Sequence, residues 1–181
     1  RKNARYLGAW PQFNGSTQPV TDKRCMAARE AYYGMGKAWK AGIPWRTKRM
    51  AFKGLVVSTL LSGLEAETLR ECDYTKLEKC MMFLARKVAG QQGVYDYGDG
   101  KRQHANAKVR ELLKISCVKV ELGVRRLRWL REILDNPTDN VQLRAAGAGQ
   151  MTTARVVVNT PYTPWLIQLA KDIRWFLECT R

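Results

Sequence analysis

Apolar residues recur at helical spacing along most of the chain, and the densest such pattern runs from Ile43 to Leu64. Pro44 fixes its own φ and suits a helix start, and basic residues follow it. From Met50 onward the apolar positions cover more than one stripe, so we expect a central helix that is buried on most sides after a basic first turn. A membrane span is excluded, because the uncharged run from Gly54 to Leu64 falls far short of the ~20 residues that a bilayer requires.

Two further helices flank this central stretch. Before it, Thr21 or Asp22 is a candidate cap, and one helical face carries Cys25, Ala28, Tyr32, Met35 and Trp39. Gly34 and Gly36 weaken that helix, so either another backbone approaches there or the helix bends. After it, Leu77, Met81, Leu84 and Val88 form a clean stripe, and Gly90 is a candidate stop. The sequence thus predicts three helices between Thr21 and Gly90.

The second half of the chain predicts more helix, separated by glycine-rich stretches. Gln91–Gly100 reads as a loop, and helices are expected over His104–Ile115 and Cys117–Asp135. The apolar face of the latter comprises Val120, Val124, Leu127, Leu130 and Leu134. Val156–Val158 suits a short strand without an obvious pairing partner, and a last amphipathic helix follows Thr163-Pro164.

These elements predict an all-α fold without a real sheet. The expected organisation is an extended lead-in over residues 1–15, a helical bundle over 16–90 and a linker over 91–103. A second helical region over 104–146 follows, and a linker with a C-terminal amphipathic helix occupies 147–181.

Charge separates this chain from an ordinary globular domain. It has 32 Lys and Arg against 16 Asp and Glu, a net charge of +16, and a sequence pI near 10.0. Such an excess is typical of proteins with an anionic partner, of which nucleic acid is the commonest. An anionic membrane surface or an acidic protein would satisfy the same physics.

Two basic clusters are the candidate nucleic-acid contacts. The first opens the central helix and comprises Arg46, Lys48, Arg49 and Lys53. Cations there oppose the helix dipole, which favours a binding role over a stabilising one. The second comprises Arg125, Arg126, Arg128 and Arg131 around Trp129, an aromatic ring that can stack on a base. Its alternative interpretation is a salt-bridged outer face, through the i,i+4 pairs Glu121–Arg125, Arg128–Glu132 and Arg131–Asp135, which leave Arg126 without a partner.

Catalytic and metal-binding signals are weak. Asp96 and Asp99 lie in a glycine-rich stretch that reads as a solvated turn, and His104, the single histidine, has no catalytic partner nearby in sequence. The five cysteines include no CxxC pair and no zinc-ligand spacing, which favours reduced thiols in a reducing compartment such as the nucleus, the cytoplasm or an organelle matrix. The chain begins at Arg1, as an internal piece of a longer protein or a processed product would. We expect no cofactor and no polymerase or nuclease activity from these residues.

The order of several motifs resembles a known family. YLG at Tyr6, GKAW at Gly36, the whole Ile43–Ala66 stretch, KLEKCMMFLARKVAG from Lys76 and VRRLRWLREILDN from Val124 are similar to the region after the catalytic palm in reverse transcriptases of non-LTR, LINE-type retrotransposons. The resemblance implies that residues 1–15 end a palm-like region, 16–90 form a thumb and 104–146 lie beyond it. The family's catalytic carboxylates lie before YLG, outside this chain, so the resemblance implies nucleic-acid handling without catalysis.

Two functions follow as expectations. The first is a non-catalytic helical module that contacts the backbone of RNA or DNA. The second is a structural subunit docked into a larger ribonucleoprotein or organellar assembly. An enzyme is expected only if these residues are part of a longer polypeptide.

Overall fold

The computed structural model describes residues 18–97, 100–135 and 165–179, and in this part the chain is mostly helical, as expected. It forms two compact units. The bundle unit comprises Gln18–Ser62 and Glu71–Val118. The described part of the other unit, called the α6–α8 unit, comprises Gly63–Arg70, the helix α6 from Lys119 onward and the helix α8. The expected lead-in over 1–15 and the short strand at Val156–Val158 lie outside the described residues.

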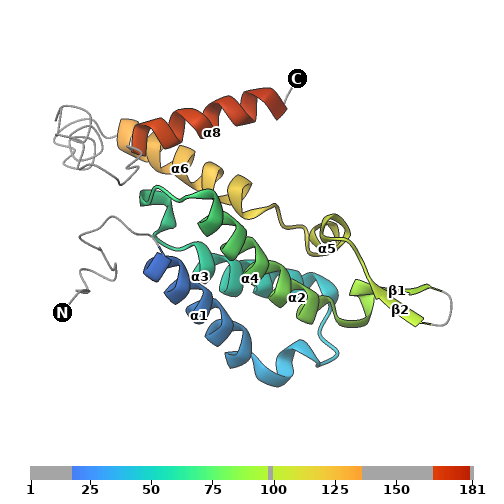
Figure 1. Ribbon diagram of the computed structural model, residues 1–181. Coiled ribbons are helices and arrows are strands. Elements are labelled where there is room, and N and C mark those ends of the chain that lie inside the picture. Colours follow the sequence, from blue (N-terminus) through green and yellow to red (C-terminus); the bar gives the residue numbers. More distant parts are fainter. Residues whose placement is uncertain (1–17, 98–99, 136–164, 180–181) are drawn as a thin grey trace. The chain divides into compact units, whose positions relative to one another are not determined.

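Three helical segments build the core of the bundle unit, as the sequence predicted (Figure 1). They pack against one another along buried apolar faces. In chain order their elements are α1 (Gln18–Gly34), the 3₁₀ turn η1 (Gly36–Trp39), α2 (Trp45–Ala51), the π-helical segment η2 (Phe52–Val57), α3 (Ser58–Leu61) and α4 (Glu71–Ala89).

The first segment ends because of backbone conformation. Helix α1 stops at Gly34, and Gly36 has a φ of +47°, a left-handed value that favours glycine. A Cβ at either glycine would meet no described atom within 4 Å, which argues against the first of the two alternatives, the close approach of another backbone. The chain turns instead, and the Trp39 indole N–H donates to the Tyr32 carbonyl at 2.7 Å, which fixes η1 against the end of α1.

The central segment is continuous from Trp45 to Leu61 but is buried on fewer sides than expected. Phe52, Val56 and Leu60 are fully buried, whereas Met50 and Leu55 are 65% and 45% exposed. The expectation was wrong on this point because an apolar side chain is buried only where another element packs against it. The π-helical segment η2 lies in the middle of this helix, and such segments often accompany functional sites.

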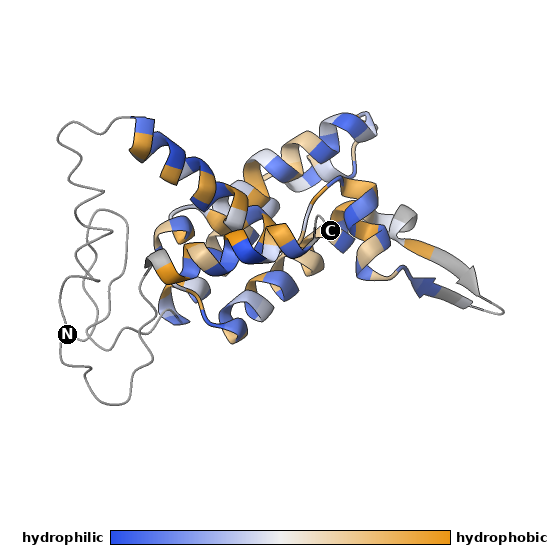
Figure 2. Ribbon diagram, turned by 90° about the horizontal axis from the view of Figure 1, so that it is seen from above, coloured by the Kyte–Doolittle hydropathy of each residue, from blue (hydrophilic) through white to orange (hydrophobic). Residues whose placement is uncertain are grey.

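Helix α4 follows the predicted stripe closely. Leu77, Met81, Leu84 and Val88 are all buried, and the helix ends at Ala89. Gly90 takes a φ of +53°, the left-handed conformation expected of a stop residue. Figure 2 shows apolar and polar residues interspersed around the helices, which is the pattern that let sequence periodicity place them.

The segment expected as a linker over 91–103 is instead ordered. A 3₁₀ turn, η4 (Gly90–Gly93), leads into strands β1 (Val94–Tyr97) and β2 (Gly100–Gln103), which pair antiparallel as a two-stranded hairpin. Both views show this hairpin projecting from the helices of the bundle unit (Figures 1 and 2). The sequence of β2 (GKRQ) holds no apolar residue, so no alternation of apolar and polar positions predicts this strand.

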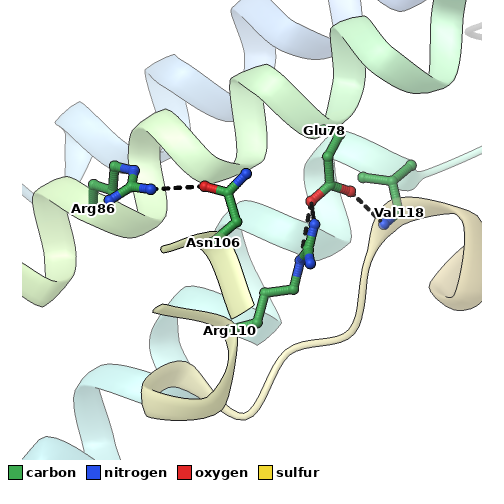
Figure 3. A network of polar contacts seen from close by, with 5 residues as sticks. All are labelled: Glu78, Arg86, Asn106, Arg110 and Val118. Carbon is green, nitrogen blue, oxygen red and sulfur yellow. Dashed lines mark hydrogen bonds and ion pairs between the residues drawn. The ribbon is translucent and has the colours of Figure 1, made fainter. Parts of the chain in front are cut away.

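Polar side chains tie helix α5 (Asn106–Leu113) to α4 (Figure 3). Glu78 accepts two hydrogen bonds from Arg110, at 2.7 and 3.2 Å, and one from the backbone N–H of Val118 at 2.7 Å. Val118 is the first residue of α6 (Val118–Asp135), so this carboxylate satisfies a helix N-terminal donor. Farther along α4, Arg86 donates to the His104 carbonyl and to the Asn106 side chain, each at 2.7 Å.

We expect Glu78→Ala to lower the free energy of unfolding by about 1–3 kcal/mol, because it strands a partly buried guanidinium and a backbone N–H. Urea denaturation followed by circular dichroism measures this change. Glu111→Ala is the matched control, since Glu111 pairs with Lys108 on an exposed face. An equal effect of both substitutions would contradict the structural role of Glu78.

The α6–α8 unit is held by packing and by a buried ion pair. Helix α6 buries Leu122, Gly123 and Arg126, and α8 (Trp165–Cys179) buries Leu169 and Asp172. A Cβ on Gly123 would lie 2.9 Å from the Phe176 ring, so glycine permits the close approach of the two helices. The predicted apolar face of α6 is therefore not its buried face, and Leu134 is 56% exposed.

None of the helices in the described ranges is both long and apolar enough to cross a membrane, in agreement with the expectation from run lengths.

Candidate nucleic-acid interface

The first basic cluster lies on α2 and the start of η2. Arg46 and Lys53 are exposed, and Lys48 and Arg49 are half-buried. Helix α2 carries no acidic residue, so no carboxylate on the same helix neutralises these cations. Because α2 and η2 form one continuous helix, the four predicted members of this cluster lie on the same helix.

Aromatic packing positions Arg49. Its guanidinium carbon lies 5.8 Å from the centroid of the Trp45 ring, within the range of a cation–π contact. The Trp45 indole N–H donates in turn to the Leu112 carbonyl in α5, at 3.2 Å. The Arg49 Nε is buried, with no hydrogen-bond acceptor among the described residues. Trp45 thus anchors Arg49 to the rest of the bundle unit.

The acid-free surface extends beyond the residues that the sequence analysis selected. Between Glu30 and Glu65 the chain has no Asp or Glu, yet it carries six cations. Two of them, Lys37 and Lys40, are exposed at η1, and the sequence analysis did not select them because they are isolated cations near the end of the first predicted helix rather than a cluster. The absence of acids over this long stretch was the signal that would have found them. We call the exposed or half-exposed cations Lys37, Lys40, Arg46, Lys48, Arg49 and Lys53 the basic tract.

Elsewhere in the bundle unit, several cations form ion pairs with carboxylates. Lys76 pairs with Asp22, Arg110 with Glu78, and Lys108 with Glu111. The ion pair with Lys108 lowers the pKa of the exposed Glu111 carboxyl, and the hydrogen bond to Asp22 raises the pKa of Lys76.

The second predicted cluster lies on α6 and is only partly accessible. Arg128 and Arg131 are exposed, whereas Arg125 and Trp129 are half-buried. Arg131 pairs with Asp135 at 3.5 Å, as the i,i+4 spacing predicted, and both side chains are well exposed. Such a pair contributes little to stability, so Arg131 stays accessible to an anion.

Arg126 corrects the prediction most clearly. The sequence placed it among the nucleic-acid contacts and gave it no partner, but its side chain is fully buried. Its guanidinium donates to Asp172 at 2.8 Å and to the Glu67 carbonyl at 3.1 Å. Gln168 donates to the other Asp172 oxygen at 3.0 Å. Arg126 is thus a structural residue of the α6–α8 unit, because its partners come from segments distant in sequence.

Burial also affects the nearby Glu67 carboxyl. Desolvation raises its pKa above the ordinary value for glutamate. The basic tract belongs to the bundle unit, and the α6 cluster belongs to the α6–α8 unit.

The structure adds no support for a catalytic role of Asp96 or Asp99. Asp96 lies in β1 of the hairpin, and Asp99 lies outside the described residues. Within the described ranges, no group of three or more His, Cys, Asp or Glu side chains is placed to hold a metal ion.

Two cysteines meet between α1 and α4. Cys25 and Cys80 are buried thiols, and the Cys80 Sγ lies 3.8 Å from the Cys25 carbonyl. Their mutual hydrogen bond, together with Arg29, lowers the pKa of Cys80 to about 7, while the pKa of Cys25 is raised. The four cysteines with described side chains are all free thiols, as the sequence analysis expected.

The comparisons with known proteins leave the function to be argued from these residues, because no protein-family model, no curated protein and no solved structure matches this chain.

Proposed function

We propose that this chain is a non-catalytic helical module that binds the backbone of nucleic acid through the basic tract. The observation that carries the proposal is the absence of acids between Glu30 and Glu65, in a stretch that bears six cations. Arg46 and Lys53 are exposed on one helix, and Lys37 and Lys40 are exposed on the turn before it. The similarity of the sequence to the thumb of non-LTR reverse transcriptases supports the same proposal.

The physics favours phosphate as the anion. Cations that lie close together on a folded surface repel one another, and a phosphate backbone relieves this repulsion while releasing counterions. Trp45 holds the Arg49 side chain by its ring contact, so less conformational entropy is lost when the guanidinium binds. Exposed Arg128 and Arg131 on α6 are a second candidate surface for the same ligand.

A structural subunit of a larger assembly is the second candidate. The observation that favours it is the apolar surface of α8, where Ile167, Ile173 and Leu177 are 45%, 39% and 62% exposed. Exposed apolar residues on one helix are typical of a surface that a partner covers.

A salt titration tests the proposed module. We expect the triple variant Arg46→Ala/Lys48→Ala/Lys53→Ala to bind duplex DNA or RNA more weakly than wild type. Each lost phosphate contact should make the slope of log K against log salt shallower by about 0.9 units. Affinity measured by fluorescence anisotropy at four or more salt concentrations gives this slope.

The matched control removes the same charge elsewhere. Lys79, Lys108 and Lys171 are exposed and lie outside the basic tract, so their triple alanine variant should leave the slope nearly unchanged. Equal slopes for the two triple variants would refute the module. If neither variant alters binding but Leu177→Asp abolishes assembly with partner proteins, the structural subunit is the better account.

A further inference from the structure

Beside the basic tract, the bundle unit carries an exposed group of aromatic rings around one ammonium. Tyr33, near the end of α1, and Phe83, in α4, are 56% and 47% exposed. The Lys87 Nζ lies 5.0 Å from the Tyr33 ring centroid and 4.7 Å from that of Phe83. We call Tyr33, Phe83 and Lys87 the aromatic clamp.

The clamp is held in place by its own contacts. The Lys87 ammonium donates to the Tyr33 hydroxyl at 2.7 Å, so one cation orients a ring from each of two helices. Tyr33 also meets the Tyr32 ring edge-on, with centroids 5.2 Å apart. Tyr32 in turn stacks on Trp39 at 5.4 Å and 9° between ring planes. Burial raises the pKa of the Tyr32 hydroxyl above its ordinary value.

This arrangement does not serve the core. Large rings in a stable domain normally bury most of their surface, yet both rings of the clamp keep about half of theirs in water. The Lys87 ammonium has three N–H donors and gives one to Tyr33, which leaves two for an anion.

The surroundings favour a negatively charged ligand. The Trp39–Tyr32 hydrogen bond fixes η1, with exposed Lys37 and Lys40, at the same end of α1 as Tyr33. Glu30, one helical turn before Tyr33, is the nearest exposed acid along α1. Cations and exposed aromatic side chains are the two features that proteins combine to bind single-stranded nucleic acid.

We propose that the aromatic clamp binds an unpaired nucleotide, with the base stacked on Tyr33 or Phe83 and its phosphate bound by Lys87. The inference rests on the proposed function and deepens it. The basic tract follows the backbone without regard to strandedness, and the clamp adds a preference for a segment that has unpaired bases. A duplex, whose bases are already stacked, gains nothing from the clamp.

The test compares three probes of equal length, namely a single strand, the same strand with abasic sites throughout, and a duplex. The double variant Tyr33→Ala/Phe83→Ala should lose affinity for the single strand by roughly 5- to 150-fold, the range of one stacked base. Its affinity for the abasic strand and for the duplex should stay within about twofold of wild type. Met26→Ala, an exposed apolar residue on the same helix α1, is the control and should change none of the three affinities.

A second variant guards against misfolding. Tyr33→Phe keeps the ring and removes the hydroxyl that accepts from Lys87, so it should retain most of the single-strand affinity. Unchanged single-strand affinity in the double variant, or an equal loss on the abasic strand, would overturn the clamp while leaving the basic tract intact. Loss of binding to phosphatidylserine vesicles, with no loss on any oligonucleotide, would assign the surface to a lipid instead.

Failure of the proposed function gives a different result. In that case the triple variant of the basic tract keeps its salt slope on the duplex, whatever the clamp variants do. The basic tract is therefore tested by its triple variant on a duplex, and the aromatic clamp is tested by its double variant on a single strand.

Discussion

Replacing Arg126 with alanine is expected to lower the free energy of unfolding by about 3–5 kcal/mol, the usual cost of removing one partner from a buried ion pair. The substitution leaves the Asp172 carboxylate buried without its cation, although Gln168 still donates to it. It also leaves the Glu67 carbonyl without its donor. Chemical denaturation monitored by circular dichroism and by tryptophan fluorescence measures the loss.

Neighbouring Arg128 provides the control, because it lies two residues away on the same helix but is exposed. Arg128→Ala should change stability by less than about 0.5 kcal/mol. A further variant, Arg126→Met/Asp172→Leu, removes both charges and should recover much of the lost stability. If Arg126→Ala is as harmless as Arg128→Ala, the buried ion pair is absent and Arg126 returns to the candidate binding residues.

Truncating Leu61 to alanine should cost about 2–5 kcal/mol, since its side chain is fully buried where the central helix packs on α1. The same truncation at Leu55, which is 45% exposed, should cost less than about 1 kcal/mol. The pair of variants has identical chemistry on one continuous helix, so their difference reports burial alone. Urea unfolding curves provide both numbers.

Comparable losses at the two positions would mean that the central helix is covered on both sides, as the sequence pattern originally suggested. A small loss at Leu55 instead leaves this face accessible to a partner.

Local sequence patterns alone predict much of the helical structure of this fold. The stripe from Leu77 to Val88 predicted α4 and its buried face. Gly90 predicted the end of α4, because glycine readily adopts the left-handed backbone conformation that follows a helix. The helices α5 and α6 also begin and end within about two residues of their expected bounds, and α8 begins directly after Thr163-Pro164, as expected. Helical periodicity and stop signals involve residues a few positions apart, so a sequence displays them directly.

Part of the candidate site could also be predicted from the sequence. Arg46 and Lys53 lie on the first and third turns of a helix that the sequence predicted, and both side chains are exposed. The aromatic clamp could not be predicted from the sequence. Tyr33 and Phe83 lie fifty residues apart in sequence, and only the packing of α1 on α4 brings both rings to Lys87.

Tertiary structure alone decided what each side chain faces. Arg126 reads as a surface arginine in its own helix, and it becomes a core residue because Asp172 and the Glu67 carbonyl arrive from elsewhere in the chain. Leu55 reads as a core residue, but it is 45% exposed because the described elements cover only part of it. A sequence records the charge and size of a side chain, whereas burial depends on neighbours that the fold supplies, and a charge can be buried only where that fold also provides its partner.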